Sequence, residues 1–420
     1  MAAVGLLGLL LGLMLFRQNV VVLFLVAAAY IHLVWGDGVL QYLVEDMWVS
    51  LDNEVLLAIP LFIMAGSVMT RGSIARRLIE ITRQITNPLP GGLGVATILS
   101  CALFAAISGS SPVTLLAVGA VLYPALLEDG YSKRFALGAL TSGGTLGIVI
   151  PPSIPMILYG LVTEKSISDL FIAGIIPGIM ITAALGGYAL WVNRHLPPKA
   201  FSATQFLSAL RAGVWSLLLP VILLGGIYSG YFSPTEAAAV ALAYALLIEI
   251  FIHRELSIKD FYGTAVDTAK TLGMLFPIIA VALSLKTILT LEQVPQDLAV
   301  WLAASVESKI AFLLAVNVLL LLVGCLFDVV SAILVLAPLL LISAEAYGID
   351  PIHFGLIMVI NLEIGFLTPP IGLNLIVAMT AFKEKFGEIC IAVLPFAAII
   401  FAVLMIVTFW PPATLGLLGR

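Results

Sequence analysis

Two stretches of the sequence place proline pairs and small polar residues inside apolar segments. One reads NLEIGFLTPPIGLN, residues 361–374, and the other reads GGTLGIVIPPSIPMIL, residues 143–158. A proline removes a backbone donor and pushes the preceding residue out of helical geometry, so neither stretch can be one continuous helix. Carbonyl and amide groups freed inside a bilayer are costly unless they face protein or water. Both stretches are therefore predicted to line a polar cavity, where backbone and side-chain oxygens suit a hard cation.

The two breaks belong to an internal repeat. The pattern Gly-x-x-x-Pro-Pro occurs in both at one constant offset, which also relates two later prolines. The matched positions are Gly147 with Gly365, Pro151 with Pro369, Pro152 with Pro370, and Pro177 with Pro395. A weaker similarity relates LLAIPLFIMAG, residues 56–66, to GMLFPIIAVAL, residues 273–283. Two interrupted helices in corresponding positions of two halves indicate the binding site of a transporter.

Composition assigns the chain to the integral membrane proteins. Of its 420 residues, 62% are hydrophobic and 10% are charged, and the mean hydropathy is +1.17. This leaves too little polar surface to cover a soluble globule of this size. The three cysteines lie in apolar runs without metal-ligand spacing, and they are interpreted as packing residues: Cys101, Cys325 and Cys390.

The hydropathy pattern predicts an all-α membrane protein with twelve apolar segments, of which two are not simple spans. Residues 91–127 are interrupted by SGSSP, and residues 310–343 by Gly324 and Asp328, so each is predicted to be a re-entrant helical hairpin. The other segments are 2–16, 20–35, 53–70, 135–163, 171–192, 212–229, 235–252, 271–290, 353–381 and 388–411.

The distribution of basic residues supports this topology. With both hairpins re-entrant, 15 of the 19 Lys and Arg residues fall in loops on one side, which is then cytoplasmic. The two halves acquire inverted topology, and both termini lie outside. The predicted organisation is scaffold helices in 1–52, a first inverted repeat in 53–192, a cytoplasmic linker in 193–211, scaffold helices in 212–270 and a second repeat in 271–420, with broken helices at 135–163 and 353–381.

Four motifs in this order give the chain a family resemblance. FAAISGSSPVT, GTLGIVIPPS, SPTEAAAV and NLEIGFLTPPIGLN together resemble the large membrane subunit of the tripartite ATP-independent periplasmic (TRAP) transporters. The similarity extends over nearly the whole chain. It implies an elevator-type, sodium-coupled importer of a small organic acid such as a C4-dicarboxylate, a sialic acid or a sugar acid. The implied partners are a separate small four-helix membrane subunit (Q type) and a periplasmic solute-binding protein (P type), in a bacterial or archaeal cytoplasmic membrane.

The breaks and hairpin tips supply the candidate site residues. Sodium ligands are predicted in the first half at Ser108, Gly109, Ser110, Ser111, Gly143, Gly144, Thr145 and Gly147, and in the second half at Gly324, Asp328, Asn361, Glu363, Gly365 and Thr368. Substrate contacts are predicted at Ser111, Pro151, Pro152, Ser153, Pro369, Pro370 and Asn374. Helices restarting at Pro151 and Pro369 would present positive N-terminal ends to a carboxylate, with Thr368 as an N-cap in the second.

Structural alternatives exist for several of these residues. The small residues from Ser108 to Ser111 also suit a tight turn, and Asp328 could fix its turn through backbone hydrogen bonds. Glu363 could be paired across helices. Ser233, Pro234 and Glu236 form a capping box with proline at the first helical position, which is a structural signature.

Other classes of function fit poorly. No nucleophile with a base, HExxH motif or Walker loop is present, and the four histidines are scattered, so the chain is not expected to be an enzyme. No tightly bound cofactor and no nucleic acid are expected, and sodium is the expected coupling ion. The main alternative is a stand-alone sodium-coupled carboxylate transporter that needs no binding protein.

Overall fold

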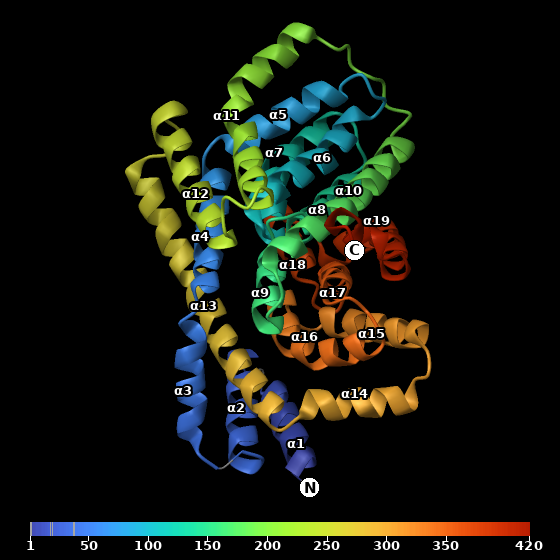
Figure 1. The fold of residues 1–420 in the computed structure, drawn as a ribbon. Coiled ribbons are helices and arrows are strands. Elements are labelled where there is room, and N and C mark those ends of the chain that lie inside the picture. The colour runs from blue at the N-terminus through green and yellow to red at the C-terminus, as the bar shows by residue number, and fades with distance from the viewer. Residues whose placement is uncertain (1, 17, 19, 37) are drawn as a thin grey trace.

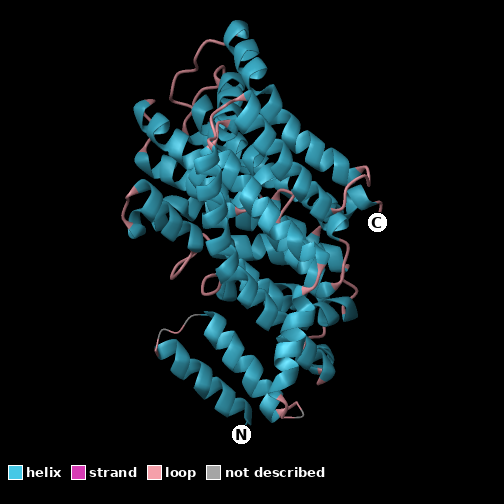
Figure 2. Ribbon diagram, turned by 90° about the vertical axis from the view of Figure 1, so that its left-hand side faces the viewer, coloured by secondary structure: helices cyan, strands magenta, loops and turns pink. Residues whose placement is uncertain are grey.

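A computed structural model describes residues 2–16, 18, 20–36 and 38–420, and the regular elements in this part of the chain are all helices (Figures 1 and 2). They are α1 Ala2–Leu15, α2 Val20–Val34, α3 Leu40–Leu51, η1 Glu54–Leu57, α4 Ala58–Arg71, α5 Ile74–Thr86, α6 Gly92–Ser108, α7 Ser111–Glu128, α8 Lys133–Val149, α9 Ile154–Thr163, α10 Ile167–Val192, α11 Ala203–Tyr228, α12 Pro234–Leu247, η2 Ile248–Ile252, α13 Ile258–Leu291, α14 Val294–Ser305, α15 Lys309–Gly324, α16 Val329–Ala346, α17 Pro351–Gly365, α18 Leu373–Phe382, α19 Phe386–Phe409, α20 Pro412–Leu415 and η3 Gly416–Leu418.

The same order of elements occurs twice. An antiparallel pair, α6 and α7 or α15 and α16, is followed by an interrupted helix, α8–α9 or α17–α18, and then by one long helix, α10 or α19. Each interruption contains a Pro-Pro peptide in the cis form, Pro151-Pro152 and Pro369-Pro370. The turns and breaks coincide with the positions at which SGSSP and the two proline pairs predict them.

The repeated elements pack together into one body. In Figure 1 the hairpins and interrupted helices lie mainly on the right, α4, α12 and α13 lie mainly on the left, α1–α3 lie below, and α11 lies at the top. The first hairpin packs against α8, the second against α17, and α8 in turn contacts α17 and α19. One continuous hydrophobic core runs through both halves and includes residues on either side of both breaks.

Within the described part of the chain, nine helical segments are long and apolar enough to cross a membrane. Six of the long helices contain an internal proline: Pro124, Pro177, Pro220, Pro277, Pro338 and Pro395. Prolines are tolerated in membrane helices because neighbouring helices satisfy the freed carbonyl groups. The fold is therefore that of a multi-pass helical membrane protein.

Five helices differ from the sequence-based prediction. Helices α3, α5 and α14 were not predicted, and they lie in stretches that were assigned to loops. Helix α13 has 34 residues, about 51 Å at 1.5 Å per residue, and so begins well before the predicted span at residue 271. Helix α11 begins at Ala203, so the predicted linker is non-helical only as far as residue 202.

The unpredicted helix α5 is anchored by a buried carboxylate. Glu249, in the π-helical turn η2, accepts hydrogen bonds from the backbone amides of Ser73 and Ile74, both at 2.7 Å. These amides lie at the N-terminus of α5, where the helix dipole favours a negative charge. The predicted capping box of α12 is also present, with Ser233 N to Glu236 Oε2 at 2.8 Å and Glu236 N to Ser233 Oγ at 3.2 Å.

Candidate functional site

The tip of the first hairpin closes onto the first break. Gly109 ends α6 with a positive φ of 59°, a conformation that L side chains rarely adopt. Its carbonyl accepts a hydrogen bond from the amide of Ile154 at 3.2 Å, at the start of α9. A Cβ added to Gly147 would lie 2.5 Å from the carbonyl oxygen of Ser110, so α8 approaches the tip closely only because this residue is glycine.

Hydroxyl groups surround the carbonyl of Ser110. Thr114 donates to it at 2.9 Å, and the hydroxyls of Ser108 and Thr114 are 2.7 Å apart. Ser111 begins α7 and is fully buried. Of the predicted first-half ligands, Ser108, Gly109, Ser110, Ser111, Gly144 and Gly147 therefore lie at this tip or against it. Gly143 and Thr145 do not, because Gly143 packs against Cys101 of α6 and Thr145 lies beside Glu363.

The second hairpin closes onto the second break in the same way. The carbonyl of Cys325 accepts a hydrogen bond from the amide of Ile371 at 3.3 Å. Behind this contact α15 and α17 touch backbone to backbone, since a Cβ on Gly365 would lie 2.4 Å from the carbonyl carbon of Gly324. Asp328 caps α16: its Oδ2 accepts from Ser331 N at 3.0 Å and its Oδ1 accepts from the Ser331 hydroxyl at 2.5 Å.

Side chains from the second half reach into the first. Asn374 is fully buried, and its Nδ2 donates to the hydroxyl of Ser111 at 2.7 Å and to the carbonyl of Thr141 at 3.2 Å. The fully buried carboxyl of Glu363 lies beside the hydroxyl of Thr145, which donates its own hydrogen bond to the carbonyl of Ser142 at 2.6 Å. Helices α17 and α18 thus share a polar seam with α7 and α8.

This seam contains buried oxygen atoms without hydrogen-bond donors. Within the part of the chain that the structure describes, these atoms are Thr141 Oγ1, Ser142 Oγ, Glu363 Oε1 and Oε2, and Asn374 Oδ1. Asn361 Oδ1 is also unpaired, but the side chain of Asn361 faces Asn317 of α15. None of the Lys or Arg side chains in that part is buried. Native proteins leave few buried polar atoms unpaired, and an unpaired buried carboxylate is particularly costly. A small cation with oxygen ligands is the chemical group that this set of acceptors fits.

The two breaks differ in exposure. Residues from Pro151 to Ser153 are buried, whereas Pro369, Pro370 and Ile371 are exposed and Thr368 is half-buried. Ser153 also uses its hydroxyl internally, since it donates to the carbonyl of Ile148 at 2.6 Å. Of the two breaks, only the second has exposed residues in this conformation.

Two predictions about the helix starts are wrong. The second segments begin at Ile154 and Leu373, not at the proline pairs, and their N-caps are Ser153 and Gly372. Thr368 is therefore not an N-cap, and its hydroxyl donates to the carbonyl of Ile364 at 2.8 Å at the end of α17. The reason is that the chain after each proline pair stays non-helical for one residue or more. The positive helix ends lie just beyond the breaks.

Four site residues were missed by sequence reasoning: Thr114, Thr141, Ser142 and Asn317. Asn317 receives the amide of Asn361 on its side-chain oxygen at 2.7 Å and on its carbonyl at 3.0 Å. It stands alone in the apolar run LLAVNVLLLL, and an isolated amide at membrane depth is a functional signal by default. Thr141 and Ser142 precede the glycine pair directly, so the same signal was available for them.

Comparison with solved structures identifies the class of fold. The YdaH transporter of Alcanivorax borkumensis matches with a TM-score of 0.66 at 18% identity, covering 90% of each chain. The MtrF structure of Neisseria gonorrhoeae matches with a TM-score of 0.58 at 13% identity, covering 90% of this chain and 85% of that one. At these identities the likeness shows the fold alone, which is a helical membrane fold shared with these two proteins.

Sequence comparison identifies the family. Residues 2–413 match the model of the DctM component of the tripartite ATP-independent periplasmic transporters. The C4-dicarboxylate large permease DctM of Pseudomonas aeruginosa is 41% identical over 389 residues, covering 92% of this chain and 91% of that protein. The isethionate permease DctMQ of Oleidesulfovibrio alaskensis is 41% identical over 380 residues, 90% of this chain and 60% of its own length. The ectoine large permease TeaC of Halomonas elongata is 38% identical over 366 residues, 86% of this chain and 85% of that protein.

The chain belongs to this family. It is a multi-pass permease component of a TRAP transporter in the bacterial inner membrane, and not an enzyme. The resemblance drawn from the four sequence motifs is thereby confirmed.

Proposed function

We propose that this permease couples the import of a small organic acid to sodium ions bound at the two hairpin tips and breaks. The observation that carries the proposal is the seam of buried, unpaired oxygens between the halves, which includes the Glu363 carboxyl and contains no buried basic side chain. Sodium ions would supply the missing positive charge. Their proposed ligands are the residues at the tips and breaks, with Thr141 and Ser142 added.

The substrate is proposed to bind at the second break. Pro369, Pro370 and Ile371 are accessible, and Asn374 lies one residue inside the N-terminus of α18. The positive end of this helix favours a carboxylate without a buried arginine. Relatives named for C4-dicarboxylates, isethionate and ectoine support a small organic solute, and we propose an organic acid of the C4-dicarboxylate, sialic acid or sugar-acid class.

The proposed mechanism is an elevator. The two hairpins, the two interrupted helices, α10 and α19 would move as one body against α1–α4 and α11–α13. The repeated element order supports this proposal, because an inverted repeat offers two related conformations of similar energy. The remaining proposed components are a Q-type small membrane subunit and a P-type periplasmic binding protein that delivers the substrate, as the family description implies.

Reconstitution tests the proposal. The chain is placed in proteoliposomes with its small subunit, and uptake of a radiolabelled acid is measured with and without the binding protein and an inward sodium gradient. Uptake is expected only when both are present. Uptake without the binding protein would favour the stand-alone transporter instead, and uptake that ignores sodium would refute the assignment of the coupling ion.

A further inference from the structure

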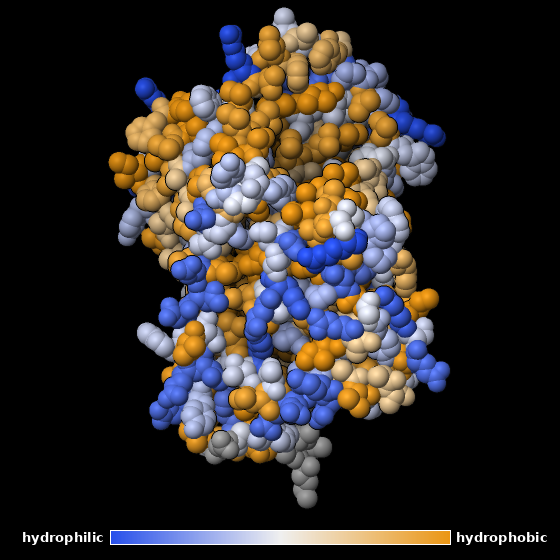
Figure 3. Space-filling view, in the orientation of Figure 1, coloured by the Kyte–Doolittle hydropathy of each residue, from blue (hydrophilic) through white to orange (hydrophobic). Residues whose placement is uncertain are grey.

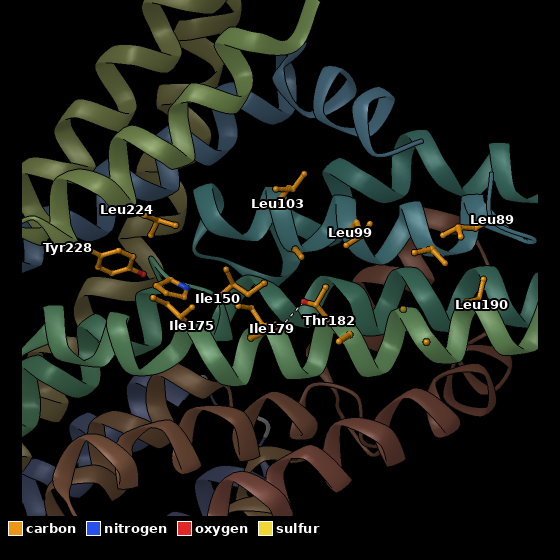
Figure 4. Close-up of a pocket in the computed structure, with 17 residues that line it drawn as sticks. Leu89, Leu99, Leu103, Ile150, Ile175, Ile179, Thr182, Leu190, Leu224 and Tyr228 are labelled. Carbon is orange, nitrogen blue, oxygen red and sulfur yellow. Dashed lines mark hydrogen bonds between the residues drawn. The ribbon is translucent and has the colours of Figure 1, made fainter. Parts of the chain in front are cut away.

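A large apolar cavity lies beside the first break, and Ile150 and Pro151 of that break line it. Its volume is about 710 Å³, it is lined mainly by α6, α10 and α11, and it is open to the surface of the molecule. Figure 4 shows Leu99 of α6 opposite Ile179 of α10, with Ile150 and Tyr228 at one end and Leu190 at the other. The cavity therefore runs along α10 from the helix break towards the end of α10.

The cavity offers no recognition group to a polar ligand. Apart from Thr182 and Tyr228, its lining side chains are apolar. The hydroxyl of Thr182 donates a hydrogen bond to the carbonyl of Gly178 at 2.7 Å, so it is not available to a ligand as a donor. The oxygen of Tyr228 is buried against protein and has no hydrogen-bond partner. An organic acid or a cation would lose its hydration here without compensation. The occupant must be apolar.

The space is present because α10 carries small residues. A Cβ added to Gly186 or Gly187 would meet no atom within 4 Å, so among the residues that the structure describes none packs directly against these two glycines. Gly178 lies nearer the break and is tightly packed: a Cβ added to it would lie 2.8 Å from Cγ1 of Ile150. Protein interiors leave few voids of this size, because the lining atoms lose their dispersion contacts.

The cavity is continuous with surface that faces hydrocarbon. Ile179 lines it and is 62% exposed, and nearby Trp191 of α10 and Val221 of α11 are 64% and 63% exposed. Figure 3 shows apolar side chains covering the upper part of the molecule, where α5 and α11 lie. In a membrane the molecules that bathe this surface are lipids, so a lipid chain has direct access.

The dimensions favour an acyl chain over a partner helix. From Ile175 to Leu190 the lining follows 16 residues of α10, a length of about 22 Å at 1.5 Å per residue. One leaflet of hydrocarbon is roughly 15 Å thick, so the cavity is long enough to hold an acyl chain lengthwise. A helix about 10 Å wide displaces roughly 400 Å³ per turn, so this cavity would admit fewer than two turns. A flexible chain fills it lengthwise.

We propose that one acyl chain of a membrane phospholipid occupies this cavity and contacts the break at Ile150 and Pro151. The chain would separate α11 from α6 and α10 along their facing surfaces. Binding follows from the shape and chemistry of the cavity alone, and it does not depend on which ion or solute the protein moves.

Photolabelling tests the proposal. The full chain is reconstituted in liposomes of phosphatidylethanolamine that contain a small fraction with a diazirine at the acyl end, and labelled peptides are mapped by mass spectrometry. Label is expected on the α6 and α10 segments around Leu99 and Ile179, above the level on the exposed face of α14 around Trp301. Label no stronger there than on α14 would overturn the proposal.

A filling variant supplies the specific comparison. Gly187→Leu places a side chain in the empty space, and the label on α6 and α10 is expected to be lost while the label on α14 stays. Gly273→Leu on α13 is the matched control, because a Cβ there also meets no atom within 4 Å. Ala183→Leu replaces Gly187→Leu if the latter is not monodisperse. Unchanged labelling in the filled variant would refute a bound chain. Loss of label from the parent protein on adding the small subunit would assign the cavity to a partner helix instead.

Discussion

The side-chain amide of Asn374 donates a hydrogen bond of 2.7 Å to the hydroxyl of Ser111. The two residues are 263 positions apart: Ser111 begins α7 after the first hairpin tip, and Asn374 is the second residue of α18 after the second break. This contact joins the two halves where both proposed binding regions meet. A shift of one half against the other would therefore change the geometry of the site.

Breaking this hydrogen bond should destabilise the protein measurably. Asn374→Ala and Ser111→Ala are each expected to cost about 1–2 kcal/mol, because a buried donor or acceptor is left without its partner. The double variant should cost less than the sum of the two by about 0.5–3 kcal/mol, as for residues in direct contact. Thermal unfolding of the purified parent, the two single variants and the double variant gives the stability differences of this double-mutant cycle. Strict additivity would show that the contact carries no coupling.

Glu363 provides the most direct test of sodium binding. Glu363→Gln keeps the size of the side chain and removes the charge from a site where neither oxygen has a donor. The sodium concentration for half-maximal uptake is expected to rise about tenfold, corresponding to about 1.4 kcal/mol. Ser343→Ala, which removes another buried and unpaired hydroxyl, is the control and should leave sodium dependence unchanged. A parental sodium curve for Glu363→Gln would exclude this carboxyl as a ligand.

Replacing Asp328 with asparagine distinguishes a helix-capping role of this residue from a role in binding an ion. Asparagine is as good an N-cap as aspartate, so Asp328→Asn should keep α16 and the melting temperature. If the charge of Asp328 neutralises an ion, sodium affinity should still fall by about 1–3 kcal/mol. Thr368→Ala and Ser110→Ala are expected to raise the sodium requirement less, because backbone carbonyls remain. Should all three variants keep the parental sodium dependence, these residues shape turns and do not bind ions.

The sequence was informative where a single residue type dictates the backbone. The proline pairs and Gly109 predicted breaks and turns because no side-chain context can restore the lost donor or the left-handed conformation. Helix α5 was missed because its charges, such as Arg76 and Arg83, indicated a loop. Its buried positions Ile74, Leu78 and Ile81 nevertheless follow helical spacing. The partner of Asn374 was not predictable, because contacts between the halves depend on packing that no local pattern encodes.

An ion pair between Lys133, the first residue of α8, and Glu384, in the loop after α18, gives the stability of the protein a pH dependence. The ammonium group of Lys133 hydrogen-bonds Glu384 at 2.5 Å, which lowers the pKa of that carboxyl, and the Tyr123 hydroxyl donates to it at 2.8 Å. A lowered folded-state pKa stabilises the protein above the ordinary value of about 4.5, and this stabilisation is lost as pH falls through the folded value.

The melting temperature should therefore decline between about pH 5 and pH 3, and Glu384→Gln should decline less over this range. The difference is expected to be small, about 0.2–1 kcal/mol, because water screens a pair near the surface. Glu307→Gln, at an exposed position between α14 and α15, is the control. Identical profiles for Glu384→Gln and the parent would show that the pair contributes nothing.

The proposed movement can be followed by comparing two further ion pairs, one between the proposed scaffold and the proposed moving body and one within the moving body. Lys286 of α13 lies 2.8 Å from Glu164, at the end of α9, whereas Lys165 lies 2.9 Å from Glu345 near the end of α16. In an elevator the first pair joins the scaffold to the moving body, and the second pair lies within the moving body. The first pair should separate during transport and the second should not.

Crosslinking of cysteine pairs at these positions measures whether each pair separates during transport. The native Cys101, Cys325 and Cys390 are first replaced by alanine, and then Glu164→Cys with Lys286→Cys is compared with Lys165→Cys with Glu345→Cys. A short bifunctional thiol reagent should link the first pair to an extent that changes with sodium and substrate, because these ligands bind the two end states unequally. The second pair should link equally in every condition. An unchanging yield for the first pair, with the protein active in uptake, would mean that α9 does not move past α13 and that the elevator proposal is wrong.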